Sequence, residues 1–327
     1  MSGSTQQFVL SPGPHLHTEE STSKIMWWVN GSLAPAALWG VFVFGMGALA
    51  VIVAAIAGAA VTEYVSQRVM GRRATLEDGS AVCTGLLMAL SVSPNLLWWQ
   101  AFLGAVFAIA LGKMIFGGLG FNLFNPAMLG RAFLMATFPL QMTSGWAAPR
   151  PWFGAPLDAV TTATPLAVLK EQGFEAAVRL IQSPVGLWNA LALGFRPGSI
   201  GEISLVLIAL GAGILLARRI ITLAIPLSVL AGVLLSTLHT GLPLLHLMSG
   251  GLWLGAFYMA TDYVTSPSVT RAQIVFGLLI GLLTGMIRVY GGYPEGICYA
   301  ILIANAMAPA LDLWFRPRRA AIAGSPS

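Results

Sequence analysis

The stretch DAVTTATPLAVLK, residues 158–170, places three threonine hydroxyls directly before a proline. Proline disfavours the α conformation in the preceding residue, so Thr164 is predicted to be extended with its hydroxyl projecting. Pro165 suits the first helical position, and an amphipathic helix with an interruption at Gly173 is predicted after it. A phosphate on Thr164 would face free backbone N–H groups and the positive end of the helix dipole. The plainer alternative is a threonine that only caps a surface helix.

The composition indicates what surrounds this stretch. Of the 327 residues 57% are hydrophobic and 9% are charged, with a mean hydropathy of +0.80. Soluble domains carry about 25% charged residues. Several apolar runs approach the roughly 20 residues that cross a bilayer. We therefore expect an all-α polytopic membrane protein, in which the net charge of +5 reports orientation and not nucleic-acid binding.

Ten membrane spans are predicted, and some are short enough to be broken or tilted helices. Their residue ranges are 25–44, 46–67, 80–95, 97–116, 124–139, 203–218, 220–239, 243–262, 272–290 and 295–313. Residues 1–24 are predicted to be a cytoplasmic N-terminal segment without a cleavable signal peptide. Residues 140–202 form one long loop, and residues 314–327 form a cytoplasmic tail.

Basic residues orient these spans. If the N-terminus is cytoplasmic, ten of the 17 Lys and Arg residues fall on the cytoplasmic side. They are Lys24, Arg68, Arg72, Arg73, Arg218, Arg219, Arg271, Arg316, Arg318 and Arg319. This bias follows the positive-inside rule and places the loop 140–202, with its threonines, outside the cytoplasm.

Two similar halves are visible in the sequence. MALSVSP at 88–94 resembles MATDYVTSP at 259–267, and each is followed at a similar distance by a glycine pair. Residues 25–139 and 203–313 are therefore predicted to be two five-span copies. Because five is odd, the copies lie in opposite orientations, as in many transporter folds with sites at helix breaks near the midplane. The candidate breaks are 93–94, 117–120, 125–126, 265–267 and 291–294.

Ionisable residues near the spans are costly in a bilayer and mark candidate sites. Lys113 and Arg288 each lie a few residues before a glycine pair, and snorkelling to the interface is the expectation for both. Asp262 is expected to line an ion or cofactor cavity. Asn125, beside a predicted break, is a second candidate for that intramembrane site.

Histidine and cysteine give no metal site in this sequence. His239 and His246 flank a predicted turn between spans, and we interpret them as interfacial residues and not as ligands. Cys83 and Cys298 lie in separate apolar segments and are expected to be small packing residues.

The threonine stretch resembles a known modification motif. DAVTTAT matches Asp-x-x-(Ser/Thr)-x-Ala-Thr, in which the last Thr is esterified through the phosphate of FMN. FGGLGFNLFNPAMLGRAFL, FYMATDYVTSP and RVYGGYPEGICYAILIANAMAP resemble the D-subunit (RnfD) family of the Rnf electron-transport complex over roughly residues 20–320. They resemble more distantly the B subunit of the Na⁺-translocating NADH:quinone reductase. Family members often have a small residue where Thr162 stands, which adds a second candidate hydroxyl.

The resemblance implies a membrane subunit of a complex that couples electron transfer between NADH and ferredoxin to Na⁺ or H⁺ translocation. It implies covalent FMN on Thr164, with Asp158 and Thr161 as recognition positions for a flavin transferase. It also implies a noncovalent riboflavin among the spans. The implied partners are the A, B, C, E and G subunits of the Rnf complex, and the implied location is the bacterial inner membrane with the FMN loop in the periplasm.

Two other functions stay open at this point. A solute transporter or channel would suit the inverted repeat and Asp262, although it has no need for Asp158, Thr161 and Thr164 at this spacing. A scaffold protein with an unmodified Thr164 is the other. The sequence does not distinguish Na⁺ from H⁺, nor the direction of electron flow.

Overall fold

The computed structural model describes residues 21–143, 146, 149, 164–181 and 196–316. Within these ranges every regular element is a helix and no strand occurs, which confirms the predicted all-α class. Four helices are long and apolar enough to cross a membrane, and shorter apolar helices accompany them. The four are α1 (Thr22–Phe44), α2 (Met46–Val69), α14 (Thr270–Tyr290) and α15 (Ile297–Phe315). The fold is that of a multi-pass membrane protein.

The first half of the chain is a bundle built around α2. Besides α1 and α2 it contains η1 (Leu76–Asp78), α3 (Ser80–Leu90), α4 (Trp98–Ile109), a π-helical turn η2 (Ala110–Met114), α5 (Pro126–Thr137) and α6 (Pro139–Thr143). Helix α2 packs on α3 and α4, and α4 packs on α5. Helices therefore occur at the five predicted positions of this half, with α3 and α5 shorter than predicted.

The second half repeats much of this packing. It contains α10 (Leu205–Ala217), α11 (Ala224–Thr237), η4 (Leu238–Thr240), α12 (Pro243–Met248), α13 (Leu252–Leu254), a π-helical turn η5 (Gly255–Met259), α14 and α15. Helix α11 packs along α14, and α14 packs on α15. The span predicted at 243–262 is not one helix. It breaks between α12 and α13, where Gly250 has a φ of 74° that most side chains would resist.

The candidate breaks fall in or beside non-helical segments that lie between helices. Residues 91–97, 115–125, 260–269 and 291–296 are not helical. Asn125 starts α5 by accepting a hydrogen bond from the Met128 N–H at 3.1 Å, and Pro126 occupies the first helical position. The break before α5 is therefore a capped helix start and not a loop in a continuous span.

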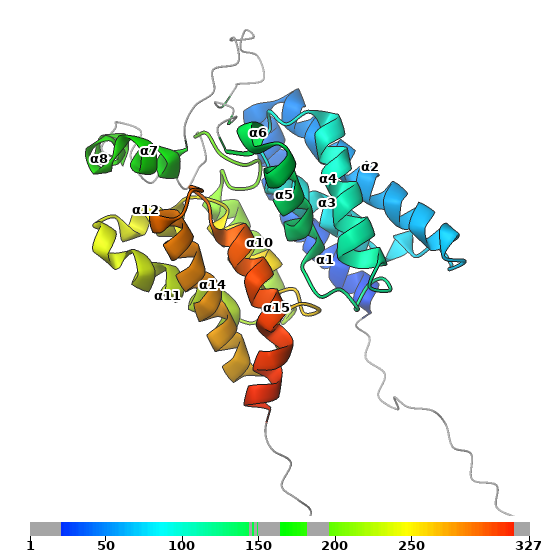
Figure 1. Cartoon of the computed structure of the whole chain (residues 1–327). Coiled ribbons are helices and arrows are strands. Elements are labelled where there is room, and N and C mark those ends of the chain that lie inside the picture. Colours follow the sequence, from blue (N-terminus) through cyan, green and yellow to red (C-terminus); the bar gives the residue numbers. More distant parts are fainter. Residues whose placement is uncertain (1–20, 144–145, 147–148, 150–163, 182–195, 317–327) are drawn as a thin grey trace, which may run out of the picture.

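The two halves meet along α1 with α10 and along α5 with α15 (Figure 1). Close approach of α1 and α10 depends on a residue without a side chain. A Cβ atom at Gly211 of α10 would lie 2.4 Å from the carbonyl oxygen of Ser32 on α1. The core of the molecule thus includes the contact between the halves.

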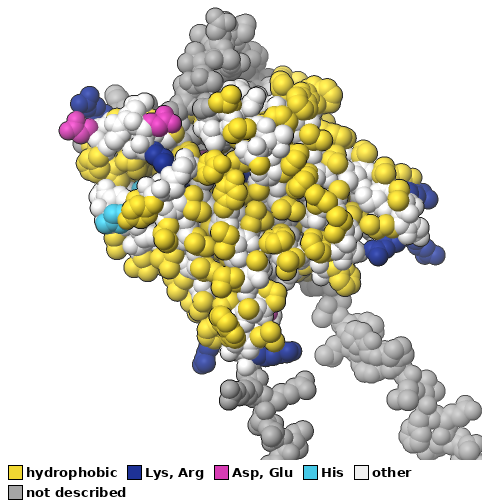
Figure 2. Space-filling model, in the orientation of Figure 1, with side chains coloured by type: hydrophobic (Ala, Val, Ile, Leu, Met, Phe, Trp, Pro, Cys, Tyr) yellow, Lys and Arg dark blue, Asp and Glu magenta, His cyan; other side chains and the backbone are white. Residues whose placement is uncertain are grey.

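The ends of the bundle differ. The start of α1 and the end of α15 lie at one end, whereas α6, α7 (Pro165–Gln172) and α8 (Phe174–Ile181) lie at the opposite end (Figure 1). Figure 2 shows hydrophobic side chains over most of the visible face, with Lys and Arg side chains at its margins. An apolar belt between charged ends is the surface that a bilayer requires.

Candidate functional site

Thr164 is the N-cap of α7. Its backbone is extended, with φ −68° and ψ 157°, and its Oγ1 accepts a hydrogen bond from the Ala167 N–H at 3.2 Å. Pro165 is the first helical residue, and α7 ends at Gln172 with Gly173 as its C-cap. These three predictions are confirmed. Asp158, Thr161 and Thr162 lie outside the described residues.

The Thr164 side chain is buried, which the sequence prediction of a projecting hydroxyl did not anticipate. It is 2% exposed, because the first turn of α7 (Leu166, Ala167 and Val168) is buried and brings Thr164 inward with it. Its oxygen therefore lies against the N-terminal N–H groups of α7. That environment suits an anion attached to the oxygen, because free N–H groups and the helix dipole both favour negative charge.

Lys170 holds α7 on the second half of the chain. Its Nζ donates hydrogen bonds to the carbonyl oxygens of Gly291 and, at 3.0 Å, Tyr293, and lies 3.5 Å from that of Arg288. These carbonyls belong to the C-terminal end of α14 and the residues after it, where a cation is favoured. Partial burial lowers the pKa of Lys170 below its usual value. Lys170 thereby fixes the threonine-bearing helix beside the break at 291–296.

A cluster of buried charges lies beneath α7. Arg131 pairs with Glu295, and Arg196 lies 3.6 Å from Glu202. Arg288 is 4% exposed and donates through its guanidinium to backbone carbonyls. The snorkelling expected for Arg288 is therefore wrong. The partners come from distant parts of the chain, and charges of both signs share one buried site.

Within this cluster Glu202, in the loop before α10, has an unusual environment. Burial raises the pKa of Glu202 to about 7, with the neighbouring Glu295 carboxylate acting in the same direction and Arg196 opposing both. Its carboxylate also accepts hydrogen bonds from the Gly250 N–H at 2.7 Å and the Ser199 hydroxyl at 3.1 Å. The sequence alone did not indicate Glu202 or Arg196, because loop residues carry no periodicity that would reveal burial.

His246 is more enclosed than its sequence position indicated. It is 2% exposed and lies in α12, so its side chain is buried within the protein. His239, in η4, stacks on Tyr290 and lies 3.3 Å from its hydroxyl. Among the described residues no group of three His, Cys, Asp or Glu side chains could hold a metal ion.

Lys113 also fails to snorkel. It is 2% exposed, and its Nζ lies 2.6 Å from a Glu63 carboxylate oxygen and 2.6 Å from the Ser80 hydroxyl. Glu63 in turn accepts a hydrogen bond from Gln67. Sequence reasoning missed Glu63, although an acid inside the apolar run 46–67 was a usable signal.

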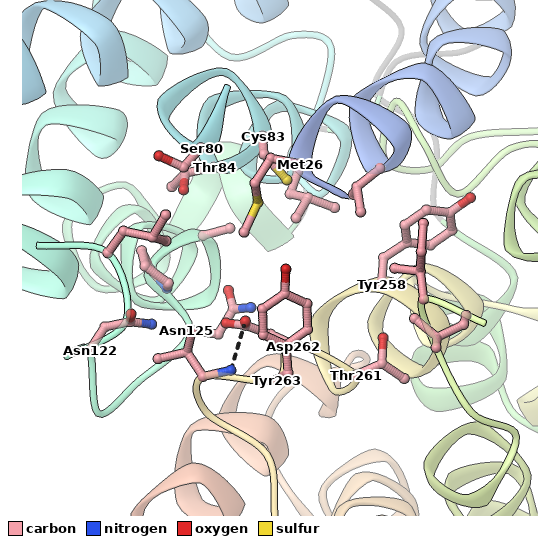
Figure 3. Close-up of a pocket in the computed structure, with 18 of the residues that line it drawn as sticks. Met26, Ser80, Cys83, Thr84, Asn122, Asn125, Tyr258, Thr261, Asp262 and Tyr263 are labelled. Atoms are coloured by element: carbon pink, nitrogen blue, oxygen red, sulfur yellow. Dashed lines mark hydrogen bonds between the residues drawn. The ribbon is translucent and has the colours of Figure 1, made fainter. Parts of the chain in front are cut away.

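A cavity lies between the two halves at the end of the bundle opposite α7. It holds about 750 Å³ of space unfilled by atoms, including open solvent. Asn125 and Asp262, the two intramembrane candidates, both line it, so the structure brings them together (Figure 3). Residues of both halves contribute to its wall, among them Ser80, Thr84 and Tyr263.

The polar groups of this cavity are not equally available. Asn125 is fully engaged, because its Nδ2 donates to the Met259 carbonyl at 3.2 Å while its Oδ1 caps α5. The Asp262 carboxylate accepts from the Val264 N–H and the Thr265 hydroxyl, both at 3.3 Å. Asn122 was not expected, yet its buried Oδ1 has no hydrogen-bond partner among the described residues. The wall therefore offers an unused acceptor beside hydroxyls and apolar side chains, as cofactor pockets do.

Comparison with known protein families shows to which family the chain belongs. A model of the NQR2, RnfD, RnfE family matches residues 9–321. The chain belongs to this family. The recognition of the D-subunit family from sequence motifs is confirmed.

Three relatives in the family cover nearly the whole chain. The chain is 44% identical over 318 residues to the D subunit of the proton-translocating ferredoxin:NAD(+) oxidoreductase complex of Clostridium ljungdahlii, with 95% of each chain covered. It is 40% identical over 310 residues to the Na(+)-translocating counterpart of Acetobacterium woodii, with 94% of each covered. It is 35% identical to the D subunit of the ion-translocating oxidoreductase complex of Pectobacterium atrosepticum, with 95% of this chain and 98% of the relative covered.

Proposed function

We propose that the chain is the RnfD-type membrane subunit of an Rnf complex, which couples electron transfer between NADH and ferredoxin to ion translocation. We propose further that it carries FMN esterified to Thr164. The observation that carries this proposal is the position of Thr164 at the N-cap of α7, directly before Pro165. Relatives at 40% identity and above are named as subunits of such oxidoreductases. Their names differ in the ion, so the proposal leaves Na⁺ or H⁺ open.

The residues around Thr164 fit a phosphoester. The hydroxyl oxygen already lies in the N-terminal turn of α7, where the Ala167 N–H donates to it. The same N–H groups would stabilise the phosphate of an attached FMN. In this proposal Asp158 and Thr161 are recognised by a flavin transferase. When bound, the flavin supplies transfer of one or two electrons.

A noncovalent riboflavin is proposed for the cavity between the halves. The free Oδ1 of Asn122 and the hydroxyls of Thr84 and Tyr263, which all line this cavity, offer partners for a polar ring and a ribityl chain. Asp262 lies in the same wall. Lys113 is less available, because Glu63 and Ser80 already engage it.

The architecture is proposed to be two inverted five-span repeats in the bacterial inner membrane. The similar packing of α2 with α4 and of α11 with α14 supports this topology. The start of α1 and the end of α15 are placed in the cytoplasm, and α7 in the periplasm, because most basic residues of the sequence then lie inside. The proposed partners are the A, B, C, E and G subunits of the complex.

In-gel flavin fluorescence tests the covalent attachment. The full chain is produced with an active flavin transferase, denatured, and examined on a gel for a fluorescent band. We expect a band in the wild type and in Thr162→Val, and none in Thr164→Val. Thr162→Val is the matched control, because it removes the neighbouring hydroxyl of the same motif. A wild-type chain without fluorescence would contradict the proposal and favour a permease or scaffold.

A further inference from the structure

A second cavity is lined by residues of α7, α12 and α14. Helix α7 lies near the ends of α12 and α14 at one end of the bundle (Figure 1). It contains about 600 Å³ of unfilled space, including open solvent. Its apolar wall includes Leu166, Leu169 and Pro294, and its polar wall includes Lys170, His246 and Arg288. Among the described residues no carboxylate lines it, so the side chains around it are neutral or cationic.

Two buried side chains in this wall have unused hydrogen-bonding atoms. Neither ring nitrogen of His246 has a partner among the described residues, although the side chain is 2% exposed. The Arg288 Nε also lacks a partner within the described part of the chain, while its two terminal nitrogens bond to the carbonyls of His246 and Ser249. Leaving buried polar atoms unpaired is costly, so such atoms normally meet a ligand or water.

The chemistry of the wall selects one class of occupant. Inorganic phosphate would use the cations but would leave the leucines and Pro294 without contact. A flat heteroaromatic ring with carbonyl and ring-nitrogen acceptors along one edge would contact both the cationic side chains and the apolar side chains. The isoalloxazine ring of a flavin has this character, with a polar pyrimidine edge and an apolar dimethylbenzene edge.

The proposed attachment point is within reach of this cavity. Thr164 caps the helix that contributes Leu166, Leu169 and Lys170 to the wall. At a rise of 1.5 Å per residue, Lys170 lies about 9 Å along the helix axis from Thr164. A ribityl–phosphate chain has enough consecutive single bonds to span that separation.

We infer that this cavity seats the isoalloxazine ring of the flavin linked to Thr164, with His246 and Arg288 facing the polar edge of the ring. This inference rests on the proposed function and adds the positioning residues. Hydrogen-bond donors and cations at that edge favour the reduced ring, which carries more negative charge there. Binding in this cavity therefore raises the midpoint potential of the linked flavin and shields the ring from solvent. Lys170 holds α7 over it through the carbonyls after α14.

His246→Leu is the test variant, and His239→Leu is its matched control. His239 lies at the same end of the second half but does not line the cavity. Leu169→Trp is a second variant that fills the cavity and leaves both histidines intact. The full chain of each is purified from cells with an active flavin transferase. Fluorescence of the denatured band gives flavin loading, and Thr164→Val supplies the background for any unlinked flavin.

Two measurements on the native chains then test whether the flavin ring lies in this cavity. We expect His246→Leu to lower the midpoint potential of the linked flavin, and Leu169→Trp to increase quenching of its fluorescence by iodide. His239→Leu should match the wild type in both. Normal loading with unchanged potential in His246→Leu and unchanged quenching in Leu169→Trp would overturn the inference alone. A wild-type band without flavin would instead overturn the proposed function, and the inference with it.

Discussion

The backbone N–H of Asn125 donates a hydrogen bond to the Asn305 side-chain oxygen at 3.1 Å, across 180 residues of sequence. The Asn305 Nδ2 in turn donates to the Thr265 carbonyl at 3.0 Å. One buried amide thus joins the break before α5 to the non-helical segment that carries Asp262. These contacts link the halves beside the cavity that we propose for riboflavin.

Replacing Asn305 with alanine is expected to destabilise the chain by about 2–3 kcal/mol, because a buried N–H and a buried carbonyl both lose their partner. Thermal unfolding in detergent measures the effect. Met307→Ala, on the exposed side of the same helix, is the control and should change little. Similar small shifts in both variants would mean that this link contributes nothing to stability.

The Lys113–Glu63 pair predicts a non-additive double substitution. Lys113→Met leaves the Glu63 carboxylate buried and uncompensated, which costs about 3–5 kcal/mol. Lys113→Met combined with Glu63→Gln removes both charges and should recover most of that loss. Unfolding in detergent and the yield of monodisperse protein report the difference. A double variant that is less stable than Lys113→Met alone would contradict the buried pair.

Close packing of α11 on α14 predicts that a Gly→Ala substitution at this contact destabilises the chain, whereas one at an open helix position does not. A Cβ atom at Gly281 would lie 2.2 Å from the Val229 carbonyl oxygen, whereas one at Gly213 would meet none of the described residues within 4 Å. We expect Gly281→Ala to cost about 1–3 kcal/mol through overpacking. Gly213→Ala, also inside a helix, should be neutral or slightly stabilising. Unfolding of the two variants side by side is the measurement, and equal tolerance would refute the helix contact.

Glu202 predicts a pH-dependent stability. Burial raises the pKa of this carboxyl from its ordinary value of 4.5 to about 7, so the folded chain keeps a proton that the unfolded chain releases. Its contribution to stability is therefore present below pH 4.5 and is lost as the pH rises through 7. Glu202→Gln should flatten the fall in unfolding temperature across that same interval. Glu171→Gln, exposed on α7, should keep the wild-type slope. An unchanged slope in Glu202→Gln would contradict the raised pKa.

The local features of the chain could be predicted from its sequence. Apolar runs indicated the helices, and the steric effect of Pro165 indicated the extended Thr164 and the start of α7. The interruption after α7 was also predicted, and it falls at Gly173, where φ is positive. Each of these depends on residues that are neighbours in the chain.

The long-range features could not be predicted in the same way. Arg131 is paired with Glu295, 164 residues away, and Lys113 with Glu63, 50 residues away. Hydropathy treats each such residue as a lone charge, for which a position at the interface is the cheaper outcome. The burial of Thr164 was missed for a related reason, because it follows from how α7 docks and not from the motif. His246 became a candidate residue only through the cavity around it.

The most direct test of the central claim is the mass of the peptide that contains Thr164, measured on protein from a host with an active flavin transferase. We expect an added mass equal to one FMN less water on Thr164, with Thr161 and Thr162 unmodified. A peptide of unmodified mass, recovered from a complex that transfers electrons, would contradict the covalent attachment.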